Sequence, residues 1–150
     1  MIRAAILTAA LTTATGAQAA AVRDCDTFEA NARNLVLPVE EGVRTFANGN
    51  VRLLHLDTGG EPACCSAHLM VLLPDPELPG QICVLISADD RSGFYAIDLP
   101  GTKAAYDPAT GLSLEVPVAL HDGTASTPRR LRLRINQQTG VVDATQEDMP

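Results

Sequence analysis

The chain has 150 residues and a formal charge of −7, with 46% hydrophobic and only 3% aromatic residues. This length fits one domain with a buried core, and the hydrophobic content argues against wholesale disorder. The scarcity of aromatic side chains and the negative charge argue against a nucleic-acid-binding surface, which depends on base stacking and phosphate contacts.

Residues 1–19 have the three parts of a signal peptide. Arg3 precedes an apolar stretch at residues 4–14, and Ala17-Gln18-Ala19 supplies the small residues of a cleavage site. We therefore expect residues 20–150 to form a single β-rich domain in the periplasm or outside the cell. No membrane span is expected, because no stretch reaches the roughly 20 apolar residues that a membrane helix needs. Cleavage would remove Arg3 and leave a more acidic protein.

The first element expected after the signal peptide is a short helix. Asp26 can cap its first turn, and Glu29, three residues later, can close a capping box. We expect this helix to end at about Asn34.

The rest of the chain has the pattern of strands separated by turns. Strands are expected, in chain order, at residues 43–47, 51–56, 67–73, 82–87 and 94–99. Asn48-Gly49 suits a tight hairpin turn, and the turns at residues 107–111 and 136–140 each begin with Asp or Asn and end in Gly. This succession predicts a mainly β fold with one short N-terminal helix, either an antiparallel β-sandwich or a small β-barrel.

Residues 112–121 and 130–135 alternate apolar and polar side chains with opposite parity. Paired strands share their faces, so even positions of the first run must lie opposite odd positions of the second. Pro117 cannot donate an N–H to a sheet ladder. We therefore expect the 112–121 strand at a sheet edge, with the amide side of Pro117 toward solvent or a bulge.

Arginine is concentrated on one strand of this acidic chain. Arg130, Arg132 and Arg134 are spaced by two residues, which places them on one face of a strand. Such a row of guanidinium groups can bind a partner that carries carboxylates or phosphates. The alternative is a solvated strand face whose arginines pair with neighbours such as Glu115.

The four cysteines, Cys25, Cys64, Cys65 and Cys83, follow the predicted signal peptide, and an even number in an exported chain indicates disulfides. In extended chain, Cys64 and Cys65 point to opposite faces. We therefore expect each to bond a different distant partner, Cys25 or Cys83. The alternative is a vicinal Cys64–Cys65 bond with a Cys25–Cys83 bond, which needs a tight turn that the preceding Gly59-Gly60 can help to form.

Cys65, His68 and Met70 offer a thiolate, an imidazole and a thioether within six residues, and copper(I) accepts such soft ligands. The His68-Leu69-Met70 segment resembles part of the motif of periplasmic copper chaperones, which are small β-sandwiches. The resemblance implies a periplasmic copper-binding protein, whose ligands would be Cys65, His68 and Met70. The alternative to copper binding is that His68 or Met70 is simply an inward-facing side chain near a disulfide.

Residues 54–59, Leu-His-Leu-Asp-Thr-Gly, resemble the active-site loop of retroviral-type aspartic proteases. In that family each subunit of a homodimer supplies one aspartate, and the two share a proton to activate water. The resemblance implies that Asp57 is catalytic in a homodimer. The simpler interpretation is a turn at the end of a strand.

Ser92-Gly93-Phe94-Tyr95 is similar to the Ser-Gly loop of periplasmic lysozyme inhibitors, small disulfide-bearing β-barrels whose exposed loop enters the enzyme's cleft. The resemblance implies a binding surface at Ser92, Gly93 and Tyr95, and an acidic inhibitor suits a basic enzyme. The expected function is therefore non-catalytic binding of a protein or another cell-envelope component, without a cofactor. Copper binding and proteolysis are the alternatives.

Overall fold

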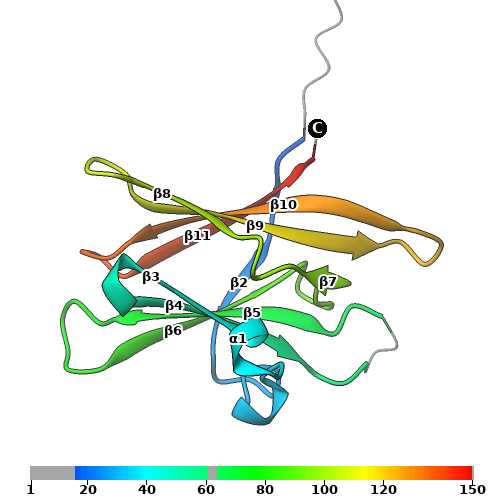
Figure 1. The fold of residues 1–150 in the computed structure, drawn as a ribbon, viewed down its shortest axis with the longest axis horizontal. Coiled ribbons are helices and arrows are strands. Elements are labelled where there is room, and N and C mark those ends of the chain that lie inside the picture. The colour runs from blue at the N-terminus through cyan, green and yellow to red at the C-terminus, as the bar shows by residue number, and fades with distance from the viewer. Residues whose placement is uncertain (1–15, 61–63, 150) are drawn as a thin grey trace, which may run out of the picture.

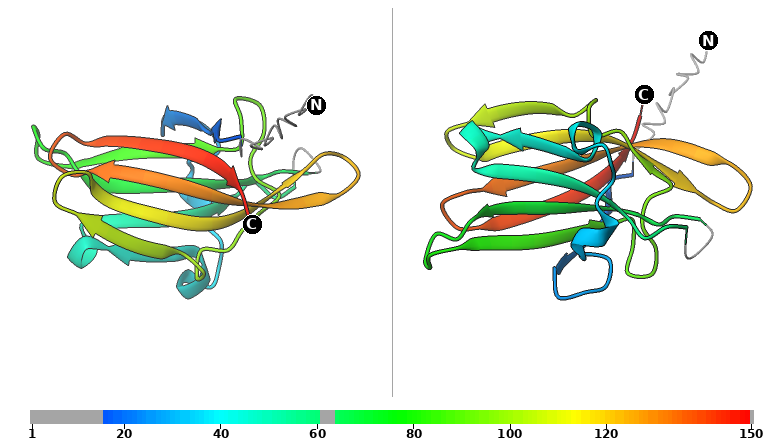
Figure 2. Two further views of the ribbon diagram at one scale, coloured as in Figure 1. Left: turned by 90° about the horizontal axis from the view of Figure 1, so that it is seen from above. Right: turned by 60° about the horizontal axis from the view of Figure 1, so that its bottom comes forward.

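The computed structural model describes residues 16–60 and 64–149. They contain two antiparallel sheets, which lie one above the other in Figure 1 and are seen from two further directions in Figure 2. Most of the predicted signal peptide, residues 1–15, lies outside the described residues. None of the helices in the described part is long and apolar enough to cross a membrane.

The first sheet has six strands in the order β1-β11-β10-β9-β7, and β8 also pairs with β9. Its strands are β1 (Gln18–Ala19), β7 (Ala96–Ile97), β8 (Lys103–Asp107), β9 (Gly111–His121), β10 (Ser126–Asn136) and β11 (Val141–Asp148). The second sheet has the order β2-β6-β5-β4-β3. Its strands are β2 (Ala21–Asp24), β3 (Val43–Phe46), β4 (Val51–Asp57), β5 (Ala67–Pro74) and β6 (Gln81–Ser87).

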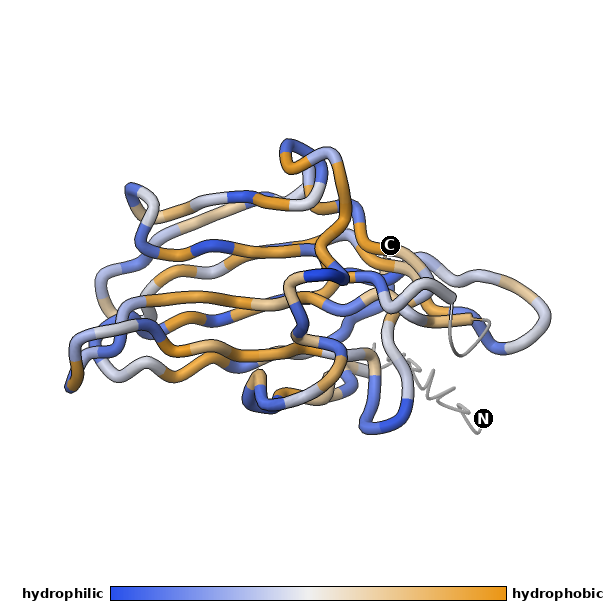
Figure 3. The backbone as a smooth tube through the Cα atoms, turned by 90° about the horizontal axis from the view of Figure 1, so that it is seen from below, coloured by the Kyte–Doolittle hydropathy of each residue, from blue (hydrophilic) through white to orange (hydrophobic). Residues whose placement is uncertain are grey.

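The apolar faces of the two sheets share one core. Hydrophobic and hydrophilic positions alternate along the strands in Figure 3, as expected when one face is buried. The core combines residues of both sheets, including Leu53, Leu69, Leu114 and Leu133, which are fully buried. The arrangement is sandwich-like, and the two sheets are not closed into a barrel.

Two segments pass from one sheet to the other. Buried Ala20 lies between β1 and β2, and its N–H donates to the carbonyl of Ala144 at 3.2 Å. Phe94 exchanges backbone hydrogen bonds with Ala67 of the second sheet before the chain joins the first sheet as β7. The strand expected at residues 94–99 is therefore only partly formed.

The other expected strands are confirmed as β3, β4, β5 and β6, and the turns at residues 107–111 and 136–140 are confirmed between β8 and β9 and between β10 and β11. The turn between β3 and β4 is wider than a two-residue hairpin turn. It contains the 3₁₀ segment Ala47–Gly49, whose three residues all have positive φ, at 51°, 56° and 87°.

The helix expected from Asp26 to about Asn34 is wrong. Within it the structure has only the 3₁₀ turn Ala32–Asn34, and the short helix α1 comes later, at Val39–Gly42. The buried side chain of Asn34 donates to the carbonyl oxygens of Phe28 at 3.0 Å and of Glu29 at 3.1 Å. These contacts replace helical hydrogen bonds, because side-chain amides compete for backbone groups.

The register predicted between residues 112–121 and 130–135 is confirmed, since Leu131 lies opposite Val116 and Leu133 opposite Leu114. The edge position is wrong, because β9 pairs with β10 on one side and with β7 and β8 on the other. Pro117 is tolerated inside the sheet because it lies between the two short strands. Its carbonyl accepts the N–H of Asp98 at 2.9 Å. The side of Pro117 that lacks an N–H therefore faces the connection between β7 and β8.

The disulfides are Cys25–Cys83 and the vicinal Cys64–Cys65. The expectation that Cys64 and Cys65 bond to distant cysteines is wrong, and the alternative pairing is present. Cys65 has φ +71°, so the chain is not extended there and the two side chains do not point to opposite faces. Cys25 and Cys83 pack against a second cluster, Leu56, Met70 and Leu85, on the outer face of the second sheet.

Candidate functional site

The polar face of the six-stranded sheet carries the predicted arginine row. Arg130, Arg132 and Arg134 alternate along β10 with Leu131 and Leu133, which are buried in the core, so the arginines lie on the outer face. The register then fixes their neighbours: Pro117 and Glu147 flank Arg130, Glu115 and Thr145 flank Arg132, and Ser113 and Asp143 flank Arg134.

Two of the three arginines form ion pairs. Glu115 lies 3.6 Å from Nε of Arg130 and 3.2 Å from Nη2 of Arg132, which also lies 3.2 Å from Glu147. The alternative interpretation, in which the arginines pair with neighbours such as Glu115, is therefore confirmed for Arg130 and Arg132. These pairs are partly exposed, so each contributes at most about 1 kcal/mol to stability. Their geometric effect is to hold the Arg132 guanidinium between two strands.

Arg134 differs from these neighbours. Both Arg134 and Lys103 of β8 are exposed, and neither forms an ion pair within the described part of the chain. Asp143 lies directly across from Arg134 on β11 without forming one. Two cations on this face are therefore available to an anion from outside.

Arg132 and Arg134 separate two grooves. The first, which we call the β8–β10 groove, has a volume of about 420 Å³ and is lined by Lys103, Ala104, Ala105, Ser113, Glu115, Arg132 and Arg134. The second, of about 340 Å³, lies toward β11 and is lined by Ala17, Arg132, Arg134, Asp143, Thr145 and Glu147. The β8–β10 groove has three cations against one carboxylate, whereas the second groove has two of each. An anion is therefore attracted more strongly to the β8–β10 groove.

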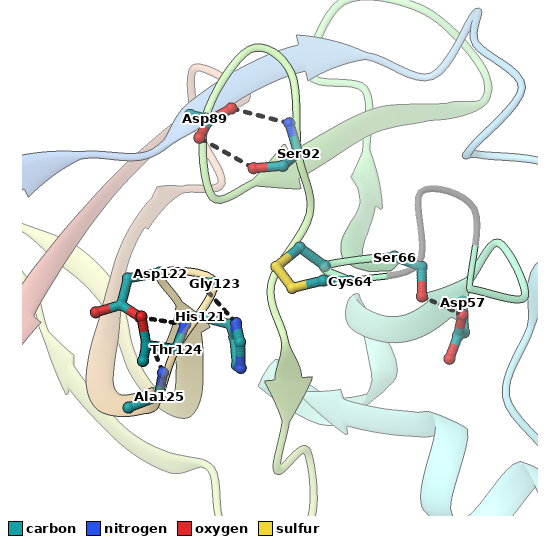
Figure 4. The surroundings of a disulfide bond; sticks show 11 residues. Asp57, Cys64, Ser66, Asp89, Ser92, His121, Asp122, Gly123, Thr124 and Ala125 are labelled. Atoms are coloured by element: carbon teal, nitrogen blue, oxygen red, sulfur yellow. Dashed lines mark hydrogen bonds between the residues drawn. A yellow bond between two sulfur atoms is a disulfide. The ribbon is translucent and has the colours of Figure 1, made fainter.

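The predicted loop surface at Ser92, Gly93 and Tyr95 lies in the connection between β6 and β7, not on the strand that carries the arginine row. The carboxylate of Asp89 accepts a hydrogen bond from the backbone N–H of Arg91 at 2.7 Å. It also accepts hydrogen bonds from the backbone N–H of Ser92 at 2.8 Å and from the Ser92 hydroxyl at 3.0 Å (Figure 4). The Arg91 N–H, followed by the Ser92 donors, holds the pKa of Asp89 below its usual value. The Ser92 hydroxyl is thus engaged inside the turn.

Gly93 and Tyr95 complete this loop. The Gly93 N–H donates to the carbonyl of Cys65 at 2.6 Å. The Tyr95 side chain is exposed, with 51% of its surface accessible, and its ring centroid lies 5.0 Å from that of His121. Of the three predicted loop residues, Tyr95 is therefore the one that presents a large side chain to solvent.

Asp57 forms a turn of its own. Its carboxylate accepts a hydrogen bond from the Gly59 N–H at 2.8 Å. It also accepts one from the Ser66 hydroxyl at 2.8 Å (Figure 4). Partial burial acts to raise the pKa of Asp57, but these hydrogen bonds and nearby His55 lower it overall. The carboxylate is thus held ionised by its own turn, as in the simpler interpretation of the Asp-Thr-Gly segment.

Each of the three predicted copper ligands makes another contact in the structure. Cys65 is bonded to Cys64, and Met70 is buried in the second cluster. His68 is buried with Nδ1 2.8 Å from the hydroxyl of Ser87, which also accepts a hydrogen bond from Arg23 at 3.0 Å. In the described part of the chain no group of three or more His, Cys, Asp or Glu residues is placed to hold a metal ion.

The sequence predicted the arginine row but missed Lys103 and the small residues Ala105 and Ser113 beside it. Lys103 is the only lysine of the chain, and this was the one feature of the sequence that could have drawn attention to it. Its position across from Glu115 depends on how β8 pairs with β9. Comparison of the chain with protein-family models, with curated proteins and with solved structures gives no match.

Proposed function

We propose that this chain is a non-catalytic binding protein of the cell envelope and that its β8–β10 groove binds a carboxylate of a protein partner. The observation that carries the proposal is that Arg134 and Lys103, both lining the groove, have no ion-pair partner among the described residues. An unpaired guanidinium offers a planar pair of donors that matches a carboxylate, and a lysine adds a second charge.

The charges around the groove favour an isolated carboxylate over a densely charged polymer. Glu115 lines the groove itself, and Asp143 and Glu147 line the neighbouring one. The chain as a whole carries −7. A polymer with closely spaced phosphates would meet these acids, whereas one carboxylate can approach Arg134 and Lys103 alone.

The shape of the site favours an extended segment of protein. Ala104, Ala105 and Ser113 line the groove without bulk or charge. All five residues of β8 are exposed, and in the described structure β8 pairs with β9 alone. The free edge of β8 can therefore offer main-chain hydrogen bonds to a partner strand whose side-chain carboxylate enters the groove.

We also propose that the chain is exported and that its fold is an antiparallel β-sandwich. The signal-peptide pattern of residues 1–19 supports export, and so does the Cys25–Cys83 bond, because such bonds persist in oxidising compartments. The core shared by both sheets supports an antiparallel β-sandwich formed by residues 20–150 as one domain.

A pair of matched peptides tests the binding proposal. One capped pentapeptide alternates alanine with glutamate, and the other alternates alanine with glutamine. The two peptides therefore have nearly the same shape, and only the first carries carboxylates. We expect calorimetry to detect binding of the glutamate peptide only. Arg134→Gln should weaken that binding at least about tenfold, because a charge-assisted hydrogen bond contributes roughly 1.5–3 kcal/mol. Added salt should weaken it further.

Arg52→Gln is the matched control. Arg52 is an exposed arginine of β4, in the other sheet, and it also forms no ion pair among the described residues. The control should leave the affinity unchanged. Equal binding of both peptides, no binding of the glutamate peptide, or an equal loss in both variants would each contradict the proposal.

A further inference from the structure

The two disulfides differ in what they can do for the fold. Cys25–Cys83 joins residues 58 positions apart, whereas Cys64–Cys65 joins neighbours. A disulfide stabilises mainly by closing a long loop in the unfolded chain, and the effect grows with loop length. The vicinal bond closes no such loop, so cross-linking of distant segments does not account for it.

The two residues of the vicinal disulfide are partly exposed. Cys64 and Cys65 lie in the connection before β5 rather than in a strand, and both are only half-buried. Figure 4 shows the surroundings of the bond, which include the turn at Asp89–Ser92 and the turn at His121–Ala125. A thiol reagent can therefore approach it from solvent.

The backbone of Cys65 is directly coupled to the 89–95 loop. Cys65 has φ +71°, a conformation that residues other than glycine rarely adopt without support. Its carbonyl accepts the N–H of Gly93 at 2.6 Å. A Cβ at Gly93 would collide with the carbonyl oxygens of Ala67 and Cys65, so the loop packs directly against this backbone.

We propose that Cys64–Cys65 is a redox-active site that exchanges with a dithiol, and that its reduction loosens the 89–95 loop. Once the bond is broken, nothing covalent holds Cys65 at positive φ, and its carbonyl can turn away from Gly93. The loop that carries exposed Tyr95 then loses one of its anchors. The proposal is independent of the β8–β10 groove, which these residues do not line.

The reaction is thiol–disulfide exchange. A thiolate of the dithiol attacks one sulfur of the Cys64–Cys65 bond, that bond breaks, and the other sulfur leaves as a thiolate and takes up a proton. The second thiol of the reductant then attacks the reductant's own sulfur in the mixed disulfide. A disulfide forms within the reductant, the mixed disulfide breaks, and the second cysteine leaves as a thiolate and takes up a proton. Two electrons and two protons pass to Cys64 and Cys65, and the reductant ends as a disulfide.

Titration with dithiothreitol tests the first part of the proposal. Samples of the full chain are alkylated at each redox potential, and the modified cysteines are identified by mass spectrometry. We expect Cys64 and Cys65 to be alkylated at potentials where Cys25 and Cys83 are still protected, since breaking the vicinal bond does not release a long loop. Reduction of both pairs together, or of Cys25–Cys83 first, would overturn the proposal.

Hydrogen exchange tests the second part. In the selectively reduced protein the Gly93 amide should exchange at least about tenfold faster, while the Leu131 amide in β10 keeps its rate. Cys64→Ser combined with Cys65→Ser should show the fast Gly93 rate without reductant. An unchanged Gly93 rate in the reduced wild-type chain would refute the coupling whether or not this variant folds.

Discussion

Replacing both Cys25 and Cys83 by alanine should cost far more stability than replacing both Cys64 and Cys65. The Cys25–Cys83 bond spans a sequence separation of 58 and the other bond a separation of 1. For a loop of the first size the chain-entropy relation gives about 4 kcal/mol at room temperature. For neighbouring residues the same relation gives only about 1 kcal/mol.

Packing adds to this difference. Cys25 and Cys83 pack against the buried cluster of Leu56, Met70 and Leu85, so truncation there also removes apolar contacts. Against a total of about 5–15 kcal/mol for a domain, the loss leaves C25A/C83A marginally folded. We expect C64A/C65A to lose about 1 kcal/mol or less, because its bond constrains little of the unfolded chain.

Urea unfolding at equilibrium measures both values. Each variant replaces two cysteines by two alanines, so the two variants are matched controls for each other. The slope of unfolding free energy against urea should rise in C25A/C83A, because its unfolded state is less compact. Equal losses in the two variants, or a larger loss in C64A/C65A, would refute this reasoning.

Two further predictions concern buried groups. Burial holds the pKa of His68 below its usual value of 6.5, although Glu29 opposes the shift. The unfolded chain therefore binds a proton that the folded chain does not, and stability should fall below about pH 6.5 by up to about 1.4 kcal/mol per pH unit. His68→Asn should flatten part of this slope in urea unfolding between pH 7 and pH 5, and an unchanged slope would exclude His68 as its source. Gly93→Ala should cost about 1–3 kcal/mol, because its Cβ meets the carbonyl oxygens of Ala67 and Cys65. A thermal unfolding midpoint equal to that of the wild type would contradict the close approach.

The strands and their register were predictable where one face of a strand is buried and the other is not. The alternation in residues 112–121 and 130–135 determined which faces had to match, and a shift by one residue would have exposed Leu131 and Leu133. The turns were predictable for a local reason, since Asp107 and Asn136 accept hydrogen bonds from the N–H groups that follow them.

The errors came from contacts that local patterns do not contain. The buried Asn34 amide takes the carbonyl groups that the expected helix would have used. Pro117 fits inside the sheet because neither β7 nor β8 pairs with it. The disulfide pairing was predicted from extended chain at Cys64 and Cys65, whereas positive φ at Cys65 removes that premise.

The candidate site was half predictable. The spacing of Arg130, Arg132 and Arg134 placed them on one face, but which of them are neutralised depends on the side chains of β9 and β11. Lys103 joins the groove through the pairing of β8 with β9, a contact between strands that the sequence pattern did not specify.

Backbone NMR with the glutamate peptide locates the binding surface. If the β8–β10 groove is the site, amide signals of Lys103, Ala105, Ser113 and Arg134 shift in proportion to bound peptide, and the glutamine peptide leaves them in place. The signals of residues 89–95 should not move. Shifts that gather at residues 89–95, or no shifts at the groove, would contradict the assignment of this groove as the anion-binding site.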